Sequence, residues 1–90
     1  MVCVIPYDDV DDAVRIANES SYGLSGSVWT TNPAQGVAVA RRMRTGQVRV
    51  NGAALATDAP FGGYKQSGIG REYGPEGLDS FLESKAIAAR

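Results

Sequence analysis

Short apolar runs alternate with amphipathic helical patterns along the first fifty residues, and Gly or Pro marks nearly every junction. Such an alternation permits few folds, because each helix must cross over from one strand to the next. Residues 2–5 form a continuous apolar run that Pro6 stops, which is typical of a strand buried on both faces. The pattern predicts strands over about 2–6, 25–30 and 47–51 and helices over about 9–19 and 33–44. This order contains two successive βαβ units, so we expect an α/β fold with a mostly parallel sheet and right-handed crossovers.

Both expected helices begin with capping residues. Asp8 and Asp9 offer N-cap oxygens, and the Asn32-Pro33 pair is typical of a helix start. Asp11 and Asp12 add negative charge in the first turn, where the helix dipole favours it. Four clustered aspartates are also candidate ligands for a hard cation, but the alternating ligands, Gly and Glu of a calcium-binding loop do not follow them. Helix capping is therefore the better interpretation.

The second part of the chain has a different character. Residues 52–70 contain five of the eleven glycines and no periodic pattern, which predicts a long loop. Long loops inside a compact domain are usually functional or packed against another part of the protein. A Gly-Pro-Glu start predicts a short helix over about 75–83, and residues 84–90 are expected to form an edge strand. The expected organisation is an α/β unit over 1–83, followed by the strand at 84–90.

The composition excludes several classes of function. The chain has no histidine, which rules out a Ser/His/Asp or Cys/His relay and a His-ligated zinc site. A net charge of −1 predicts no nucleic-acid partner, and no apolar run approaches the length that crosses a membrane. No secretory signal follows Met1, and one cysteine fits a reducing compartment, so we expect a cytoplasmic protein. Cys3 lies inside an expected strand without a base or cation beside it, which predicts a small buried residue.

The glycine-rich run from Pro60 to Glu72 is the main candidate for a functional segment. Gly63 and Gly68 have the spacing of a phosphate-binding loop, but the Lys and Ser/Thr that must follow directly are absent. Tyr73 stands where a dinucleotide fingerprint needs its third Gly. The residues alone therefore describe a path of tight turns, and a purely structural role remains open.

The same run closely resembles the C-terminal signature of the NAD(P)-dependent aldehyde dehydrogenases. Four other segments fall in the order and spacing of that family, so that the resemblance covers essentially the whole chain. They are Tyr22-Gly23-Leu24-Ser25, Val28-Trp29-Thr30, Val50-Asn51 and Leu82-Glu83-Ser84-Lys85. The resemblance implies the C-terminal segment of an enzyme that oxidises aldehydes to carboxylic acids with NAD or NADP.

What the resemblance leaves out matters as much. The family's nucleophilic Cys, its general-base Glu and its nucleotide-binding domain have no counterpart in these residues, and Cys3 does not match the nucleophile. We therefore expect no catalytic, cofactor-binding or metal residue in this chain, and no activity from the chain alone.

The resemblance assigns architectural roles instead. Phe61 matches an aromatic of the substrate-tunnel wall, and the other residues of the signature loop shape the turns beside the active site. Arg71 and Glu83 resemble members of an ionic network near the subunit interface, to which the C-terminal strand also contributes. The loop residues are Pro60, Gly62, Gly63, Lys65, Ser67, Gly68, Gly70, Arg71 and Glu72, and those of the interface are Arg71, Glu83, Lys85, Ala86, Ile87 and Ala88.

Two interpretations follow. The first is a piece of a dehydrogenase that pairs with other aldehyde dehydrogenase subunits. The second is a free-standing structural or oligomerisation module that pairs with itself or with a full-length subunit. In both, an open strand edge and apolar helix faces predict self-association of the isolated chain.

Overall fold

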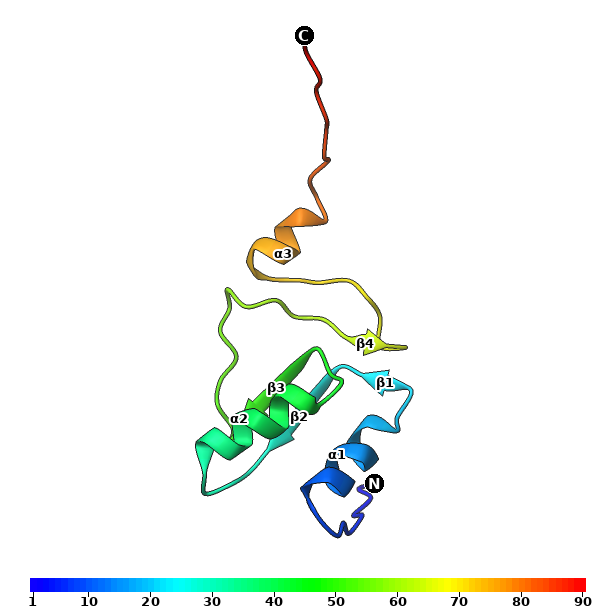
Figure 1. The fold of residues 1–90 in the computed structure, drawn as a ribbon, viewed down its shortest axis with the longest axis vertical. Coiled ribbons are helices and arrows are strands. Elements are labelled where there is room, and N and C mark those ends of the chain that lie inside the picture. The colour runs from blue at the N-terminus through cyan, green and yellow to red at the C-terminus, as the bar shows by residue number, and fades with distance from the viewer.

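A single βαβ unit forms the centre of the molecule. The computed structural model describes residues 1–90, and in it strand β2 (Ser25–Val28) pairs in parallel with β3 (Gln47–Val50) across helix α2 (Pro33–Arg42) (Figure 1). The register runs from Ser25 opposite Gln47 to Val28 opposite Val50. Asn32 caps α2 through a hydrogen bond from the backbone N–H of Gln35. The structure thus has one parallel pair where the sequence predicts two successive βαβ units.

Helix α2 lies close to this sheet because Gly36 has no side chain. A Cβ at Gly36 would lie 2.7 Å from Cγ1 of Val50 and 2.9 Å from Cγ2 of Thr30. Both distances are well inside van der Waals contact. The backbone of α2 at Gly36 therefore packs directly against the side chain of Val50 in β3.

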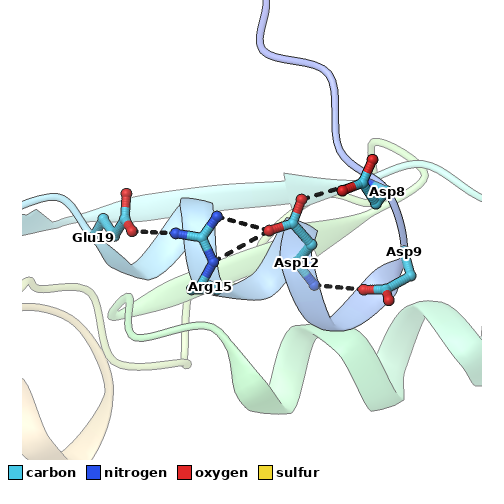
Figure 2. A network of polar contacts seen from close by, with 5 residues as sticks. All are labelled: Asp8, Asp9, Asp12, Arg15 and Glu19. Carbon is cyan, nitrogen blue, oxygen red and sulfur yellow. Dashed lines mark hydrogen bonds and ion pairs between the residues drawn. The ribbon is translucent and has the colours of Figure 1, made fainter.

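Helix α1 (Val10–Asn18) precedes the βαβ unit and is held at its start by an acidic network (Figure 2). The carboxylate of Asp9 accepts a hydrogen bond of 2.8 Å from the backbone N–H of Asp12. The Asp12 carboxylate in turn accepts one of 3.2 Å from the N–H of Asp8, and Arg15 lies between Asp12 and Glu19. The hydrogen bond from Arg15, followed by that from the N–H of Asp8, lowers the pKa of Asp12, and the hydrogen bond to Asp12 together with the charge of Glu19 raises the pKa of Arg15. The aspartates thus cap the helix, as the sequence indicates.

Polar contacts join α1 to the end of α2. Arg42 forms an ion pair of 2.7 Å with Asp11. The Asn18 side chain donates to the carbonyl of Arg42 at 3.0 Å and accepts from the N–H of Arg44 at 2.8 Å. Asn18 therefore satisfies backbone groups at the C-terminal end of α2, where helical partners run out.

The remaining elements are short. Strand β1 (Tyr22–Gly23) pairs antiparallel with β4 (Tyr64–Lys65), and helix α3 (Gly74–Asp79) precedes an extended tail. The tail carries the C-terminus away from the rest of the molecule, to the end opposite the N-terminus (Figure 1). No helix has the length and apolar character needed to cross a membrane.

The structure corrects three expectations. Residues 2–6 and 84–90 form no strand, because a strand requires a neighbouring strand for its N–H and C=O groups and none of residues 1–90 lies beside them. Cys3 belongs to the first of these segments and is consequently exposed instead of buried. Helix α3 ends at Asp79, short of the expected 83, because Phe81 (86% exposed) and Leu82 (61%) find nothing to pack against.

Very little apolar surface is buried within the chain. Val14 is the one buried hydrophobic residue. The accessible surface is 7391 Å², against about 5,000 Å² for a compact monomer of this mass. The radius of gyration is 17.0 Å, against about 12 Å for a compact domain of ninety residues. The chain is therefore more extended than a compact domain of the same length.

Candidate functional site

The two ends of the loop from Pro60 to Glu72 are hydrogen-bonded to each other. The N–H of Phe61 donates to the carbonyl of Glu72 at 2.8 Å, and the N–H of Glu72 donates back to Phe61 at 2.7 Å. This reciprocal pair is an isolated antiparallel bridge. The position of Phe61 is therefore tied to the far end of the loop.

The middle of the loop is attached to the start of β1. Strand β4 supplies the antiparallel pairing, and the N–H of Gln66 donates to the carbonyl of Ser21 at 3.0 Å. The Ser67 hydroxyl accepts a hydrogen bond of 3.0 Å from the N–H of Gly23. Hydrogen bonds thus join residues 21–23 to residues 66–67, more than forty residues apart in sequence.

Lys65 connects the loop to the end of α1. Its Nζ donates to the carbonyls of Asn18 at 2.7 Å and Ser20 at 2.9 Å. A cation here lies at the negative end of the helix dipole and satisfies carbonyls that have no helical partner. Lys65 adopts a left-handed backbone with φ of 55°, which a side chain other than Gly rarely does.

Arg71 fills the inside of the loop. Its Nη1 donates to the carbonyls of Gly63 at 2.9 Å and Gly70 at 2.8 Å. The guanidinium also lies 5.7 Å from the centre of the Tyr64 ring, and that of Arg44 lies 5.0 Å from the same ring. Arg71 is half-buried, and it holds the two sides of the loop at a fixed separation.

Glycines allow the loop backbone to approach the βαβ unit. A Cβ at Gly46 would overlap the carbonyl oxygen of Gly62, and a Cβ at Gly62 would overlap the carbonyl oxygen of Gly70. Gly62 and Gly63 are buried. By contrast, Gly70 has nothing within 4 Å of its Cβ position. Close packing therefore requires glycine at positions 46 and 62 but not at position 70.

Phe61 lies beside a cavity of about 260 Å³ between the loop and β3. Its ring meets that of Tyr73 edge-to-face, with centroids 6.3 Å apart and planes inclined by 77°. Sequence reasoning missed Tyr73, Asn18 and Arg44, because a Tyr before Gly-Pro and polar residues at helix ends carry no distinctive signal. The cavity lining includes Gln47, Arg49, Leu55, Ala56, Phe61 and Tyr73.

The expected interface residues do not come together within the chain. Glu83 and residues 85–88 lie in the exposed extended tail, and Arg71 donates to loop carbonyls rather than to Glu83. An ionic network with a partner subunit stays a prediction.

The side-chain contacts of the loop position its backbone. No group of three or more Cys, Asp or Glu side chains converges within residues 1–90 in a way that could hold a metal ion. The loop does not fit the phosphates of a dinucleotide either, since its two cations, Lys65 and Arg71, are directed at backbone carbonyls. The arrangement places two aromatic rings, those of Phe61 and Tyr73, beside a cavity.

Sequence comparison relates nearly the whole chain to known enzymes. The profile of the aldehyde dehydrogenase family matches residues 1–87. The chain is 53% identical over 87 residues to 3-succinoylsemialdehyde-pyridine dehydrogenase of a Pseudomonas species, and 47% identical over 87 residues to geranial dehydrogenase of Castellaniella defragrans. Each alignment covers 97% of this chain and 18% of the relative. The chain thus spans less than a fifth of the length of these relatives.

Solved structures give the same relationship. A mutant of aldehyde dehydrogenase C from Pseudomonas syringae, in complex with NAD⁺ and octanal, superposes with a TM-score of 0.91 at 49% identity, covering 96% of this chain and 18% of that one. An aldehyde dehydrogenase of Mycobacterium tuberculosis, in complex with NAD⁺, superposes with a TM-score of 0.82 at 55% identity, covering 86% and 16%.

Proposed function

Because this chain belongs to the aldehyde dehydrogenase family, we propose that it works as the C-terminal segment of an NAD(P)-dependent aldehyde dehydrogenase. In this role the signature loop supplies part of the wall around the aldehyde, and the tail contributes to a subunit interface. The nucleophilic Cys, the general-base Glu and the nucleotide-binding domain belong to other parts of the enzyme. The ninety residues by themselves are inactive.

One observation carries the proposal. The chain follows a segment of a dehydrogenase about five times as long with a TM-score of 0.91, although it buries a single hydrophobic side chain of its own. A chain that formed its fold alone would cover its apolar residues. Exposed side chains such as Val2, Trp29 and Ile87 are accounted for if the rest of a subunit covers them.

The signature loop supports the local part of the proposal. Phe61 is fixed by its two hydrogen bonds to Glu72, and its ring borders the cavity next to β3. An aromatic wall held in this way binds the apolar part of a substrate without taking part in proton transfer. Two relatives are named for aldehydes with a pyridine ring and with a terpene chain, and a third was crystallised with octanal. These compounds define the first substrates to test.

The deciding experiment is the mass of the native polypeptide, detected in its source with an antibody against these residues. A species several times heavier than 9.5 kDa, which oxidises geranial or octanal with NAD⁺ or NADP⁺, supports the proposal. The isolated ninety residues are expected to show neither saturable NAD⁺ binding in calorimetry nor aldehyde oxidation. A native species of 9.5 kDa would overturn the proposal and favour the free-standing module.

A further inference from the structure

Tyr73 has the most unusual backbone conformation in the chain. Its φ of 61° and ψ of 157° lie in a region that is essentially restricted to glycine, and a side chain there costs free energy. The residue precedes α3 and makes no side-chain capping hydrogen bond. A sharp turn into α3 would be served better by glycine, so the turn alone does not account for a tyrosine.

The surroundings of Tyr73 hold it in this conformation. The preceding residue, Glu72, is hydrogen-bonded in both directions to Phe61. The following residue, Gly74, lies so close to the backbone carbonyl of Asp58 that a Cβ would be 2.5 Å from the oxygen. The strained residue is thus clamped on both sides against the segment that carries Phe61.

The consequence of this clamp is the placement of the Tyr73 ring. The ring stands edge-to-face to Phe61 and lines the same cavity of about 260 Å³. Tyr73 is 60% exposed within these ninety residues, so it can make a further contact that the chain itself does not supply. The two ring planes are inclined by 77°, and together the rings form an apolar surface against which an alkyl chain can pack.

We propose that Tyr73 is a specificity-determining residue, which together with Phe61 binds the apolar tail of the aldehyde. This inference rests on the proposed function, because it takes the substrate to be an aldehyde whose tail passes Phe61. The apolar chain of the aldehyde lies against the two rings. Its reacting carbonyl lies in the part of the enzyme that residues 1–90 do not supply. The side chain of Tyr73 makes no capping hydrogen bond to α3, so we assign the effect to the ring.

The test uses the native polypeptide that carries these residues and a series of linear aldehydes from ethanal to octanal. Tyr73→Ala should lower kcat/KM for octanal about tenfold and leave that for ethanal within about twofold, since a lost apolar contact matters only where the tail reaches it. Tyr73→Phe keeps the ring and should restore the wild-type dependence on chain length. Tyr7→Ala is the matched control, because Tyr7 is 62% exposed and lies outside the loop.

A second variant separates recognition from folding. Tyr73→Gly removes the ring and relieves the backbone strain, so its Tm should be at least that of the wild type while its preference for long aldehydes is lost. An equal loss of kcat/KM for ethanal and octanal, or an unchanged chain-length dependence in Tyr73→Ala and Tyr73→Gly, would overturn the role of Tyr73 and leave the proposed function standing. Failure of the wild-type polypeptide to oxidise any aldehyde would overturn the proposed function itself.

Discussion

The signature loop and the C-terminal tail both lack long regular elements, yet they differ in what holds them. Within the loop, Lys65, Ser67 and Arg71 all make hydrogen bonds to backbone groups of the chain. In the tail, the N–H of Leu82 makes the last hydrogen bond, and Ile87 is 85% exposed. The loop is therefore held by contacts within these ninety residues, whereas the tail is not.

The comparison with solved dehydrogenases supports this division. Superposition on the Pseudomonas syringae enzyme covers 96% of the chain, so it takes in part of the tail as well as the loop. The superposed part of the tail follows the same path in a much longer protein although no hydrogen bond within residues 1–90 holds it there. Because exposed extended segments with apolar side chains are prone to pair with another chain, we propose such pairing for the tail.

The largest expected effect is self-association of the ninety residues when they are isolated from the rest of a dehydrogenase subunit. We expect the isolated ninety residues to self-associate, so that light scattering at high concentration gives a mass well above 9.5 kDa. Charged substitutions at Phe81 and Ile87, which are 86% and 85% exposed, should reduce the association without touching the loop. A monomer at every concentration and salt level would contradict the assignment of the tail as a pairing surface.

The next largest effect concerns the packing of the loop. Gly46→Ala places a Cβ on the carbonyl oxygen of Gly62. Because that oxygen belongs to the backbone, no flexible side chain can move away to relieve the overlap. We expect the free energy of unfolding of the native polypeptide to fall by about 3 kcal/mol, measured by denaturant titration. Gly70→Ala is the control, since its Cβ meets nothing within 4 Å and should change stability little. Equal effects at the two positions would mean that the loop does not pack against the βαβ unit.

Sequence reasoning located the helices and the parallel pair because periodicity and caps are local signals. Asp9 and Asn32 show this, since each caps the helix that its position indicates. It failed at residues 2–6 and 84–90, because apolar runs show that a segment prefers burial but not whether a partner strand is present. In the site, the resemblance singled out Phe61, whereas the conformation of Tyr73 is held by contacts of its neighbours, Glu72 with Phe61 and Gly74 with Asp58, that no local pattern records.

A smaller effect tests the inside of the loop. Arg71→Met removes the donor from the carbonyls of Gly63 and Gly70, and Gly63 is buried. We expect a loss of about 2 kcal/mol in the free energy of unfolding of the native polypeptide, because a buried carbonyl is left without its partner. Arg44→Met removes the other cation from the Tyr64 ring and should cost about 0.5 kcal/mol, since Arg44 is exposed. A larger loss at Arg44 than at Arg71 would show that the aromatic contact, and not the hydrogen bonds, shapes the loop.

The smallest effect separates helix α1 from the loop by its response to acid. The hydrogen bond from Arg15, and then that from the N–H of Asp8, lowers the pKa of Asp12 below its ordinary 3.8. The stabilisation is therefore complete above the unfolded-state pKa and is lost as the pH falls through the folded-state pKa. In a carbon-13 NMR titration, Arg15→Met should move the pKa of Asp12 up toward its ordinary value, whereas Arg42→Met, which breaks the pair with Asp11, should leave it unchanged. If Arg15→Met left the titration of Asp12 unaltered, the network in Figure 2 would not exist in solution. The loop should be insensitive over this range, because Lys65 and Arg71 donate to backbone carbonyls, which do not titrate.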